Sequence, residues 1–133
     1  MKRILIVDDN FVNRSYLEEI FHDKAKCLIA VNGAEAFMAF SNAFEGKRPF
    51  DLILIDMEMP VMNGLDAVAH IREYERLAGI DVAHRVPIIA ITAHEEQFTK
   101  CFEAGCDQYV LKPVNPPALV RMSNELMNRD LEE

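Results

Sequence analysis

Cysteine is scarce in this chain, and so are long hydrophobic runs. The 133 residues include three cysteines, Cys27, Cys101 and Cys106, an odd number without the spacing of a zinc site. We therefore expect reduced thiols in or near the core rather than a disulfide framework. The initial Met-Lys-Arg is followed by only four aliphatic residues, 4–7, before two aspartates. This run is too short for a signal peptide, and no run approaches the length of a membrane span, so we expect a cytoplasmic protein.

Positive charge and glycine-rich loops are also in short supply. Lysine and arginine total 14 against 22 acidic residues, which gives a formal net charge of −8 at pH 7. Nucleic acids and anionic membranes are bound by basic faces, so this balance argues against both as partners of this chain alone and leaves basic protein surfaces as candidates. The chain has neither a P-loop nor a glycine-rich dinucleotide fingerprint, which argues against ATP binding.

Short aliphatic segments alternate with amphipathic ones along the chain. The run 52–55 is too short for a helix and rich in β-branching, which is typical of a strand buried on both faces of a parallel sheet. Five strands alternating with five helices predict a single α/β domain over 1–133, a doubly wound parallel sheet with helices on two faces. Strands are expected at 4–7, 27–31, 52–55, 87–91 and 108–111, and helices at 11–22, 33–45, 65–78, 95–104 and from 116 to a frayed tail at 130–133.

Helix ends are marked by residues suited to capping. Asn10 is expected to cap the first helix, and Gly105 is well placed as the left-handed stop of the fourth. In that fourth helix, Phe98, Cys101 and Phe102 are expected to face the core.

Polar side chains follow four of the five predicted strands. Asp8 and Asp9 follow the first strand, Asp56 the third, Thr92 the fourth and Lys112 the fifth. Each taken alone has an ordinary structural explanation, as a helix cap, a turn former or a solvated charge. Because the carboxyl ends of parallel strands meet at one edge of a sheet, we expect these groups to converge there, where open α/β sheets place their ligand sites.

The converging groups suit phosphoryl chemistry with a divalent cation. Neighbouring carboxylates repel by about 4 kcal/mol per close pair at an effective dielectric near 20, so the empty site is costly. A hard cation with oxygen ligands, Mg²⁺ first and Mn²⁺ as a substitute, relieves that repulsion. Lys112 and Thr92 supply a charge and a hydroxyl for phosphoryl oxygens, and a carboxylate is a recognised phosphoryl acceptor. Asp56, the central carboxylate, is the predicted nucleophile.

Two other classes of protein remain as alternatives. A phosphatase with an aspartyl nucleophile would want a second acid two residues on with a threonine or valine nearby, and here Glu58 is followed by Met59 and Pro60. A flavodoxin-like cofactor binder shares the architecture but needs a hydroxyl-rich phosphate loop after the first strand. Here that place holds Asp8 and Asp9, which repel phosphate.

Four segments together resemble the receiver domain of two-component response regulators, and the match covers essentially the whole chain. Their sequence is most similar to the receivers of hybrid histidine kinases. The resemblance implies a flavodoxin-like sheet with strand order 2-1-3-4-5. The segments are Ile-Leu-Ile-Val-Asp8-Asp9-Asn, Asp51-Leu-Ile-Leu-Ile-Asp56-Met-Glu-Met-Pro60-Val-Met-Asn-Gly64, Pro87-Ile-Ile-Ala-Ile-Thr92-Ala93 and Asp107-Gln-Tyr109-Val-Leu-Lys112-Pro113-Val.

The resemblance implies a metal and a phosphoryl donor. Asp9 and Asp56 would ligate Mg²⁺ directly, Asp8 would act through water, and the backbone carbonyl of Glu58 would complete the protein ligands. Asp56 would accept phosphate from a phosphohistidine on a histidine kinase or a histidine phosphotransfer protein. The chain would then be a switch that catalyses its own phosphorylation and dephosphorylation rather than an enzyme acting on another substrate. It could stand alone, with an unknown downstream protein, or be an excised receiver that passes phosphate along a relay.

The resemblance also implies a switch. Thr92 would turn inward to hydrogen-bond the phosphoryl group, Tyr109 would follow, and the surface of the fourth helix, fifth strand and fifth helix would change. Taken alone, Tyr109 is also compatible with an ordinary strand aromatic. Lys112 would pair with the phosphoryl group, the backbone amide of Ala93 would approach its oxygens, and the Lys112–Pro113 peptide would be cis. Glu58 and His94 would tune the phosphoryl lifetime, in a direction left open.

Overall fold

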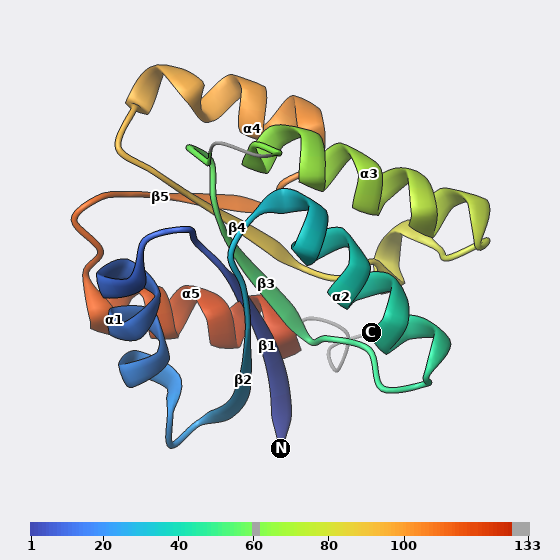
Figure 1. Cartoon of the computed structure of the whole chain (residues 1–133), viewed down its shortest axis with the longest axis horizontal. Coiled ribbons are helices and arrows are strands. Elements are labelled where there is room, and N and C mark those ends of the chain that lie inside the picture. The colour runs from blue at the N-terminus through green and yellow to red at the C-terminus, as the bar shows by residue number, and fades with distance from the viewer. Residues whose placement is uncertain (60–61, 129–133) are drawn as a thin grey trace.

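A five-stranded parallel sheet forms the centre of the protein. The computed structural model describes residues 1–59 and 62–128. The strands run in the order β2-β1-β3-β4-β5, and all neighbouring pairs are parallel, as predicted. The strands are β1 (Lys2–Val7), β2 (Ala25–Ala30), β3 (Leu52–Asp56), β4 (Ile88–Thr92) and β5 (Gln108–Leu111), and the helices are α1 (Phe11–Phe21), α2 (Gly33–Glu45), α3 (Gly64–Leu77), α4 (Phe98–Ala104) and α5 (Pro116–Asn128) (Figure 1).

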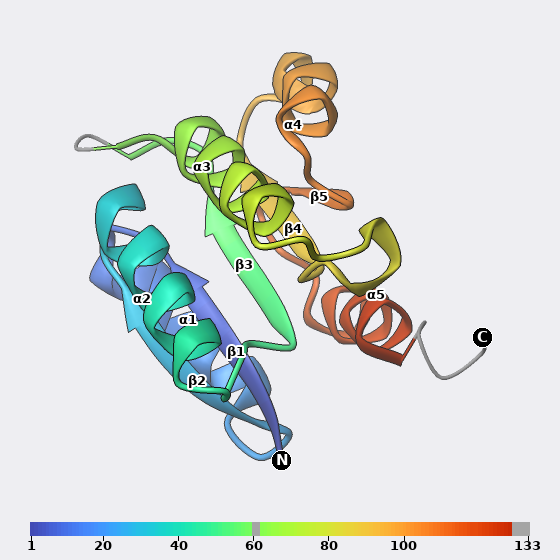
Figure 2. The same cartoon turned by 90° about the vertical axis from the view of Figure 1, so that its right-hand side faces the viewer.

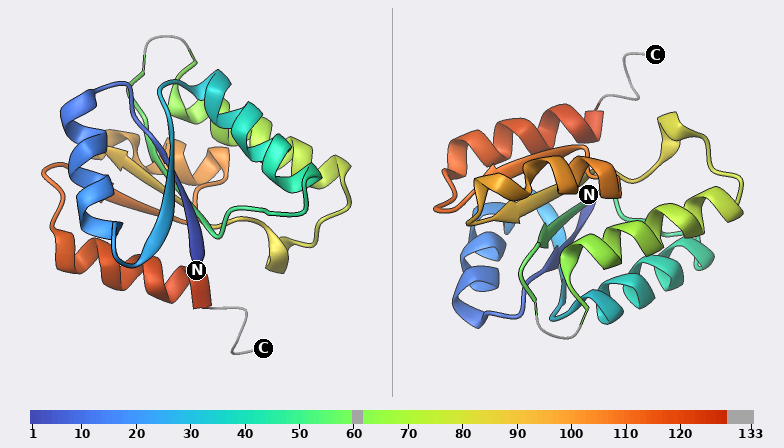
Figure 3. Two further views of the ribbon diagram at one scale, coloured as in Figure 1. Left: turned by 60° about the horizontal axis from the view of Figure 1, so that its bottom comes forward. Right: turned by 90° about the horizontal axis from the view of Figure 1, so that it is seen from above.

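The helices cover both faces of the sheet because the central strands are apolar on both sides. In β1 and β3, Leu5, Val7, Ile53 and Ile55 pack in a core with residues of α2, α3 and α4. The alternate residues of the same strands lie in a second core with Leu17 and Phe21 of α1 and Leu119 of α5. Figures 2 and 3 show α1 and α5 on one side of the sheet and α2 and α3 on the other. β3 lies between the two cores, so its end is fixed from both sides.

Asparagine side chains begin four of the helices beside the carboxyl edge of the sheet. The Oδ1 atoms of Asn10, Asn32, Asn63 and Asn115 accept hydrogen bonds from the main-chain N–H groups three residues on, at 3.0, 2.8, 2.8 and 3.0 Å. These bonds satisfy donors that the first helical turn leaves free. The predicted cap at Asn10 is confirmed, and so is the left-handed stop at Gly105, which has a φ of 119°.

Several predicted boundaries need correction. β2 begins at Ala25, two residues before the predicted start at residue 27, because its parallel pairing with β1 extends back to Lys2. The predicted helix 95–104 is a 3₁₀ helix, Glu95–Gln97, followed by α4. Phe102, expected to be buried, is 46% exposed, because a seven-residue helix turns only a narrow face to the core. The predicted frayed tail at 130–133 lies outside the described residues, and no helix of the described part is long and apolar enough to cross a bilayer.

Candidate functional site

Three carboxylates meet at the carboxyl edge of the sheet. Asp56 is the last residue of β3, and Asp8 and Asp9 directly follow β1, which pairs with β3. One carboxylate oxygen from each lies within 4.8 Å of the other two. Asp8 and Asp56 are buried, whereas Asp9 is exposed. The convergence predicted from the sequence is therefore present, and the cluster opens to solvent on the side of Asp9.

Specific hydrogen bonds fix the two buried carboxylates. Oδ1 of Asp56 accepts from Nζ of Lys112 at 3.1 Å and from the main-chain N–H of Glu58 at 3.2 Å. Oδ1 of Asp8 accepts from the main-chain N–H of Asn10 at 2.9 Å. Lys112 follows β5, and its own N–H donates to the carbonyl of Thr92 at 2.8 Å. The Lys112–Pro113 peptide is cis, as the resemblance implied.

The burial of these acids has an electrostatic cost. Burial first, and then the charge of Asp8, raise the pKa of Asp56 to about 7, although Lys112 partly offsets them. Burial also raises the pKa of Asp8. A hard divalent cation would offset both effects, and the donor set of clustered carboxylate oxygens with a nearby backbone carbonyl suits Mg²⁺. The residues present therefore fit the ion that the sequence predicts.

We expect Asp8→Asn to stabilise the metal-free protein by about 1 kcal/mol. The amide oxygen of asparagine still accepts from Asn10, whereas a buried charge beside Asp56 is gone. Urea unfolding in excess chelator measures the gain, and Mg²⁺ should stabilise wild type but scarcely affect the variant. Asp23→Asn, which alters an exposed ion pair with Lys24, is the matched control and should show little change. Unaltered or lower stability of Asp8→Asn in chelator would count against a strained acidic cluster.

Thr92 and Glu58 are joined beside Asp56. The Thr92 hydroxyl, at the end of β4, donates to Oε1 of Glu58 at 2.6 Å and accepts from the main-chain N–H of His94 at 3.0 Å. Burial by itself would raise the pKa of Glu58, but the Thr92 hydroxyl first, then the Asp56 side chain, the charge of Lys112 and the backbone N–H of Ala93, bring it below its ordinary value. Nε2 of His94 lies 3.7 Å from Oε1 of Glu58. The sequence placed these residues at the site but did not predict that Thr92 and Glu58 would bond.

Tyr109 lies on the α4 side of the site. It sits in β5 opposite Ala90 of β4, and its half-buried ring stacks on Phe98 with centroids 3.5 Å apart. The ring of Phe102 meets it edge-on at 5.3 Å. Tyr109 thus belongs to an aromatic cluster that joins β5 to α4, which the sequence analysis did not foresee.

A buried ionic network was also missed. In α3, the guanidinium of Arg72 bonds Oε1 of Glu75 at 2.7 Å and Oδ2 of Asp107 at 2.9 Å, together with the carbonyls of Val86 and Gly105. Positions 72 and 75 continue the apolar stripe of Val68 and Ile71 at helical spacing. Charged residues on such a stripe indicate a buried ion pair, and this was the signal that the sequence offered. The network ties α3 to the starts of β4 and β5, whose far ends carry Thr92 and Lys112.

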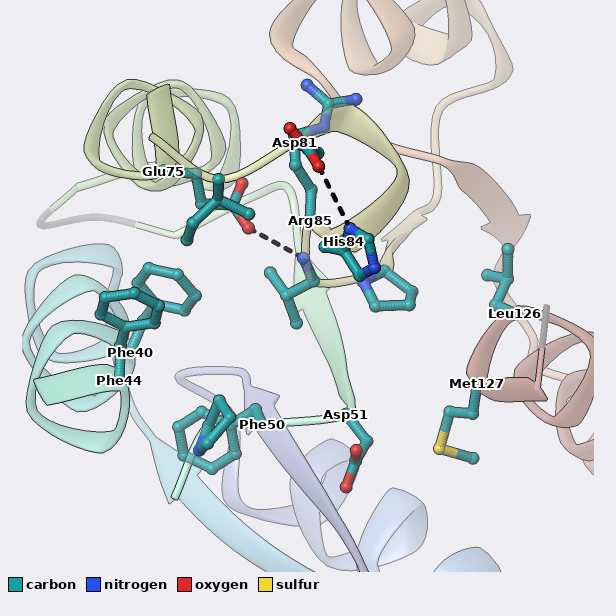
Figure 4. Close-up of a pocket in the computed structure, with 14 residues that line it drawn as sticks. Phe40, Phe44, Phe50, Asp51, Glu75, Asp81, His84, Arg85, Leu126 and Met127 are labelled. Atoms are coloured by element: carbon teal, nitrogen blue, oxygen red, sulfur yellow. Dashed lines mark hydrogen bonds and ion pairs between the residues drawn. The ribbon is translucent and has the colours of Figure 1, made fainter. Parts of the chain in front are cut away.

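Two hollows lie at opposite ends of the sheet. One, of about 510 Å³, adjoins Asp8 and Lys112 and is walled by apolar residues that include Val12, Tyr16 and Pro113. The other, of about 570 Å³, lies near the amino ends of β3 and β4 and is drawn in Figure 4, with Phe40, Phe44 and Phe50 on one side and Leu126 and Met127 on the other. Only the first borders the acidic cluster, so it is the one relevant to the site.

Comparisons with known proteins agree with this geometry. The response regulator receiver domain family matches residues 4–124. Hybrid signal transduction histidine kinase I of Dictyostelium discoideum is 32% identical over 99% of this chain, and probable histidine kinase 1 of Oryza sativa subsp. indica is 38% identical over 85%. The chain spans only 8% and 14% of these two relatives.

Solved structures show the same architecture. The receiver domain of a sensor histidine kinase from Pseudomonas aeruginosa, with magnesium in its active-site cleft, is 28% identical with a TM-score of 0.79, covering 96% of this chain and 98% of that one. A receiver from Saccharomyces cerevisiae, crystallised with a histidine phosphotransfer protein, is 31% identical with a TM-score of 0.84, covering 97% and 90%. The chain belongs to the response regulator receiver domains. It is a receiver of two-component and phosphorelay signalling.

Proposed function

We propose that this receiver accepts a phosphoryl group on Asp56 in a reaction that depends on Mg²⁺. The observation that carries the proposal is the buried Asp56 carboxylate, held by Lys112 at 3.1 Å and clustered with Asp8 and Asp9. This one arrangement combines an acceptor, a set of cation ligands and a positive charge. The donor would be a phosphohistidine on a histidine kinase or a histidine phosphotransfer protein.

Each side chain of the site would have its own role in phosphoryl transfer. A carboxylate oxygen of Asp56 attacks phosphorus, the phosphorus–nitrogen bond breaks, and its electron pair returns to the imidazole of the donor. Asp8, Asp9, Asp56 and the carbonyl of Glu58 would hold Mg²⁺, which when bound supplies positive charge beside the transferring group. Lys112, which now pairs with Asp56, would move its charge toward the phosphoryl oxygens. The same machinery would let the domain take phosphate from a small acyl phosphate and later hydrolyse it.

The surface beside the site suits a protein donor. Phe11, Val12 and Tyr16 of α1 are 69%, 72% and 47% exposed, and Val12 and Tyr16 also line the hollow next to Asp8 and Lys112. Apolar side chains grouped on a surface favour protein contact. The Saccharomyces cerevisiae receiver was crystallised with a histidine phosphotransfer protein, which supports a partner of that class here.

The output would pass through Thr92 and Tyr109. The Thr92 hydroxyl and the backbone N–H of Ala93 would bind the phosphoryl group, and Tyr109 with its α4 partners would rearrange the surface of α4, β5 and α5. Since one of the relatives named above is a hybrid histidine kinase, onward relay to a second histidine is the other candidate role. Incubating the phosphorylated receiver with unphosphorylated histidine phosphotransfer protein separates the two roles, because only a relay receiver returns most of its phosphate.

The direct test uses a histidine phosphotransfer protein labelled with radioactive phosphate. We expect the label to appear on this chain with Mg²⁺ and not with chelator. The acid-stable and alkali-labile behaviour of an acyl phosphate should accompany it. Label that resists alkali, or transfer that ignores Mg²⁺, would contradict the proposal.

Lys112→Ala should slow phosphorylation about a hundredfold while changing stability little, because the charge acts on the phosphoryl group formed during transfer. Rates of labelling and urea unfolding, measured on the same preparation, separate the two effects. Lys100→Ala removes an exposed lysine of α4 and should leave both unchanged. If the labelling rate and the free energy of unfolding both fell strongly, Lys112 would have a structural role instead.

A further inference from the structure

The carboxylate of Glu58 accepts a hydrogen bond that the proposed mechanism assigns to a phosphoryl group. The Thr92 hydroxyl donates to its Oε1 at 2.6 Å, a short bond of the kind formed with charged acceptors. The Thr92 hydroxyl is proposed above to bind the phosphoryl group, so one anion already engages a donor intended for another.

We propose that Glu58 occupies part of the phosphoryl-binding position in the unphosphorylated protein, holds Thr92 in place, and must leave before Thr92 can bond the phosphoryl group. The inference rests on the proposed function of Asp56. Glu58 is then a positioning residue, since it acts on the reaction through Thr92. Its effect is to oppose activation, which gives a direction to the tuning role expected from the sequence.

The geometry keeps the Glu58 carboxylate close to Asp56 but allows it to move away from Thr92. Its main-chain N–H is bonded to Oδ1 of Asp56 at 3.2 Å, so its carboxylate stays tethered beside the acceptor. Its Oε2 is buried and has no hydrogen-bond partner among the described residues. The side chain as a whole is 33% exposed, and Nε2 of His94 lies 3.7 Å from Oε1 toward the surface. Moving outward lets the unpaired oxygen meet water, which lowers the cost of releasing Thr92.

Competition between Glu58 and the phosphoryl group for the Thr92 hydroxyl predicts a measurable effect. A ligand shifts a two-state equilibrium by its differential affinity, and an internal competitor reduces the apparent affinity of that ligand. The Glu58 carboxylate competes through one hydrogen bond of typical net strength. Removing it should therefore raise the affinity of the protein for a phosphoryl mimic about fivefold.

The experiment is calorimetric titration of beryllofluoride with Mg²⁺ into wild type and Glu58→Ala. We expect Glu58→Ala to bind about fivefold more tightly. Glu95→Ala is the matched control, because it removes the same charge from the exposed 3₁₀ helix after β4 and should bind like wild type. Equal gains in both variants would mean a general charge effect and would overturn the inference.

A double-mutant cycle isolates the link to Thr92. In a Thr92→Ala background, Glu58→Ala should no longer change affinity, whereas in Thr92→Ser, which keeps the hydroxyl, the gain should return. Methyl NMR reports on Thr92 directly. In ligand-free Glu58→Ala, the Thr92 methyl resonance should shift toward its position in the beryllofluoride-bound protein. A full gain that persists in Thr92→Ala would overturn the inference.

The outcomes also separate this inference from the proposed function. Wild type that binds beryllofluoride and accepts phosphate, with Glu58→Ala unchanged, refutes the role of Glu58 alone. Wild type that binds no beryllofluoride and accepts no phosphate from any donor refutes both.

Discussion

Asp56→Asn should abolish phosphorylation from a phosphohistidine donor while preserving the fold. The amide keeps the shape of the side chain and an oxygen for the N–H of Glu58, but it is no longer a carboxylate nucleophile. We also expect the variant to be more stable than wild type in chelator. The carboxylate of Asp56 carries a pKa of about 7 through burial and the charge of Asp8, so ionising it at neutral pH destabilises the folded state.

Radiolabel transfer and urea unfolding measure the two effects. Asp23→Asn, an exposed aspartate far from the site in sequence, should accept label like wild type. Persistent labelling of Asp56→Asn would move the acceptor to another residue. A variant that unfolds more readily than wild type in chelator would show that Asp56 stabilises the fold, contrary to the strain argued for it.

Arg72→Ala should lower the free energy of unfolding by about 3 to 5 kcal/mol. The guanidinium is nearly inaccessible, and its removal would leave the carboxylates of Glu75 and Asp107 without their main cation. The carbonyls of Val86 and Gly105 would lose donors as well. Breaking a buried charge network from one side costs far more than the intact network contributes, because uncompensated charge remains in the interior.

Arg76→Ala provides a control within the same helix. Arg76 pairs with Glu73 at the surface of α3, where side chains are 68% and 54% exposed, so its loss should cost about 1 kcal/mol or less. Urea unfolding of both variants gives the comparison. Similar small losses would mean that Arg72 does not tie α3 to β4 and β5. A large loss should be accompanied by slower phosphorylation, since those strands carry Thr92 and Lys112.

The fold and the acidic cluster could be predicted because strong local signals determine them. Aliphatic runs such as 52–55 identify buried parallel strands, and parallel strands place their carboxyl ends at one edge whatever the details of packing. The convergence of Asp8, Asp9 and Asp56 can therefore be predicted without knowing any side-chain conformation. The cis Lys112–Pro113 peptide followed from the resemblance alone.

Other features depend on side-chain geometry that spacing does not determine. Thr92 and Glu58 are 34 residues apart in the sequence, and only the structure shows that the Thr92 hydroxyl bonds Glu58. Phe102 fits the helical stripe, yet the shortness of α4 leaves it 46% exposed. Glu75 lies one turn from Arg72 in α3, but Asp107 is 35 residues away, so spacing alone does not show that the three residues form one network.

The central claim is that Asp56 is a Mg²⁺-dependent phosphoryl acceptor, and intact-mass spectrometry tests it most directly. Wild type and Asp56→Asn would each be incubated with acetyl phosphate, with Mg²⁺ or with chelator. The account predicts a single added phosphoryl group on wild type with Mg²⁺, and none in the other three samples. Addition to Asp56→Asn, or addition to wild type in chelator, would contradict it.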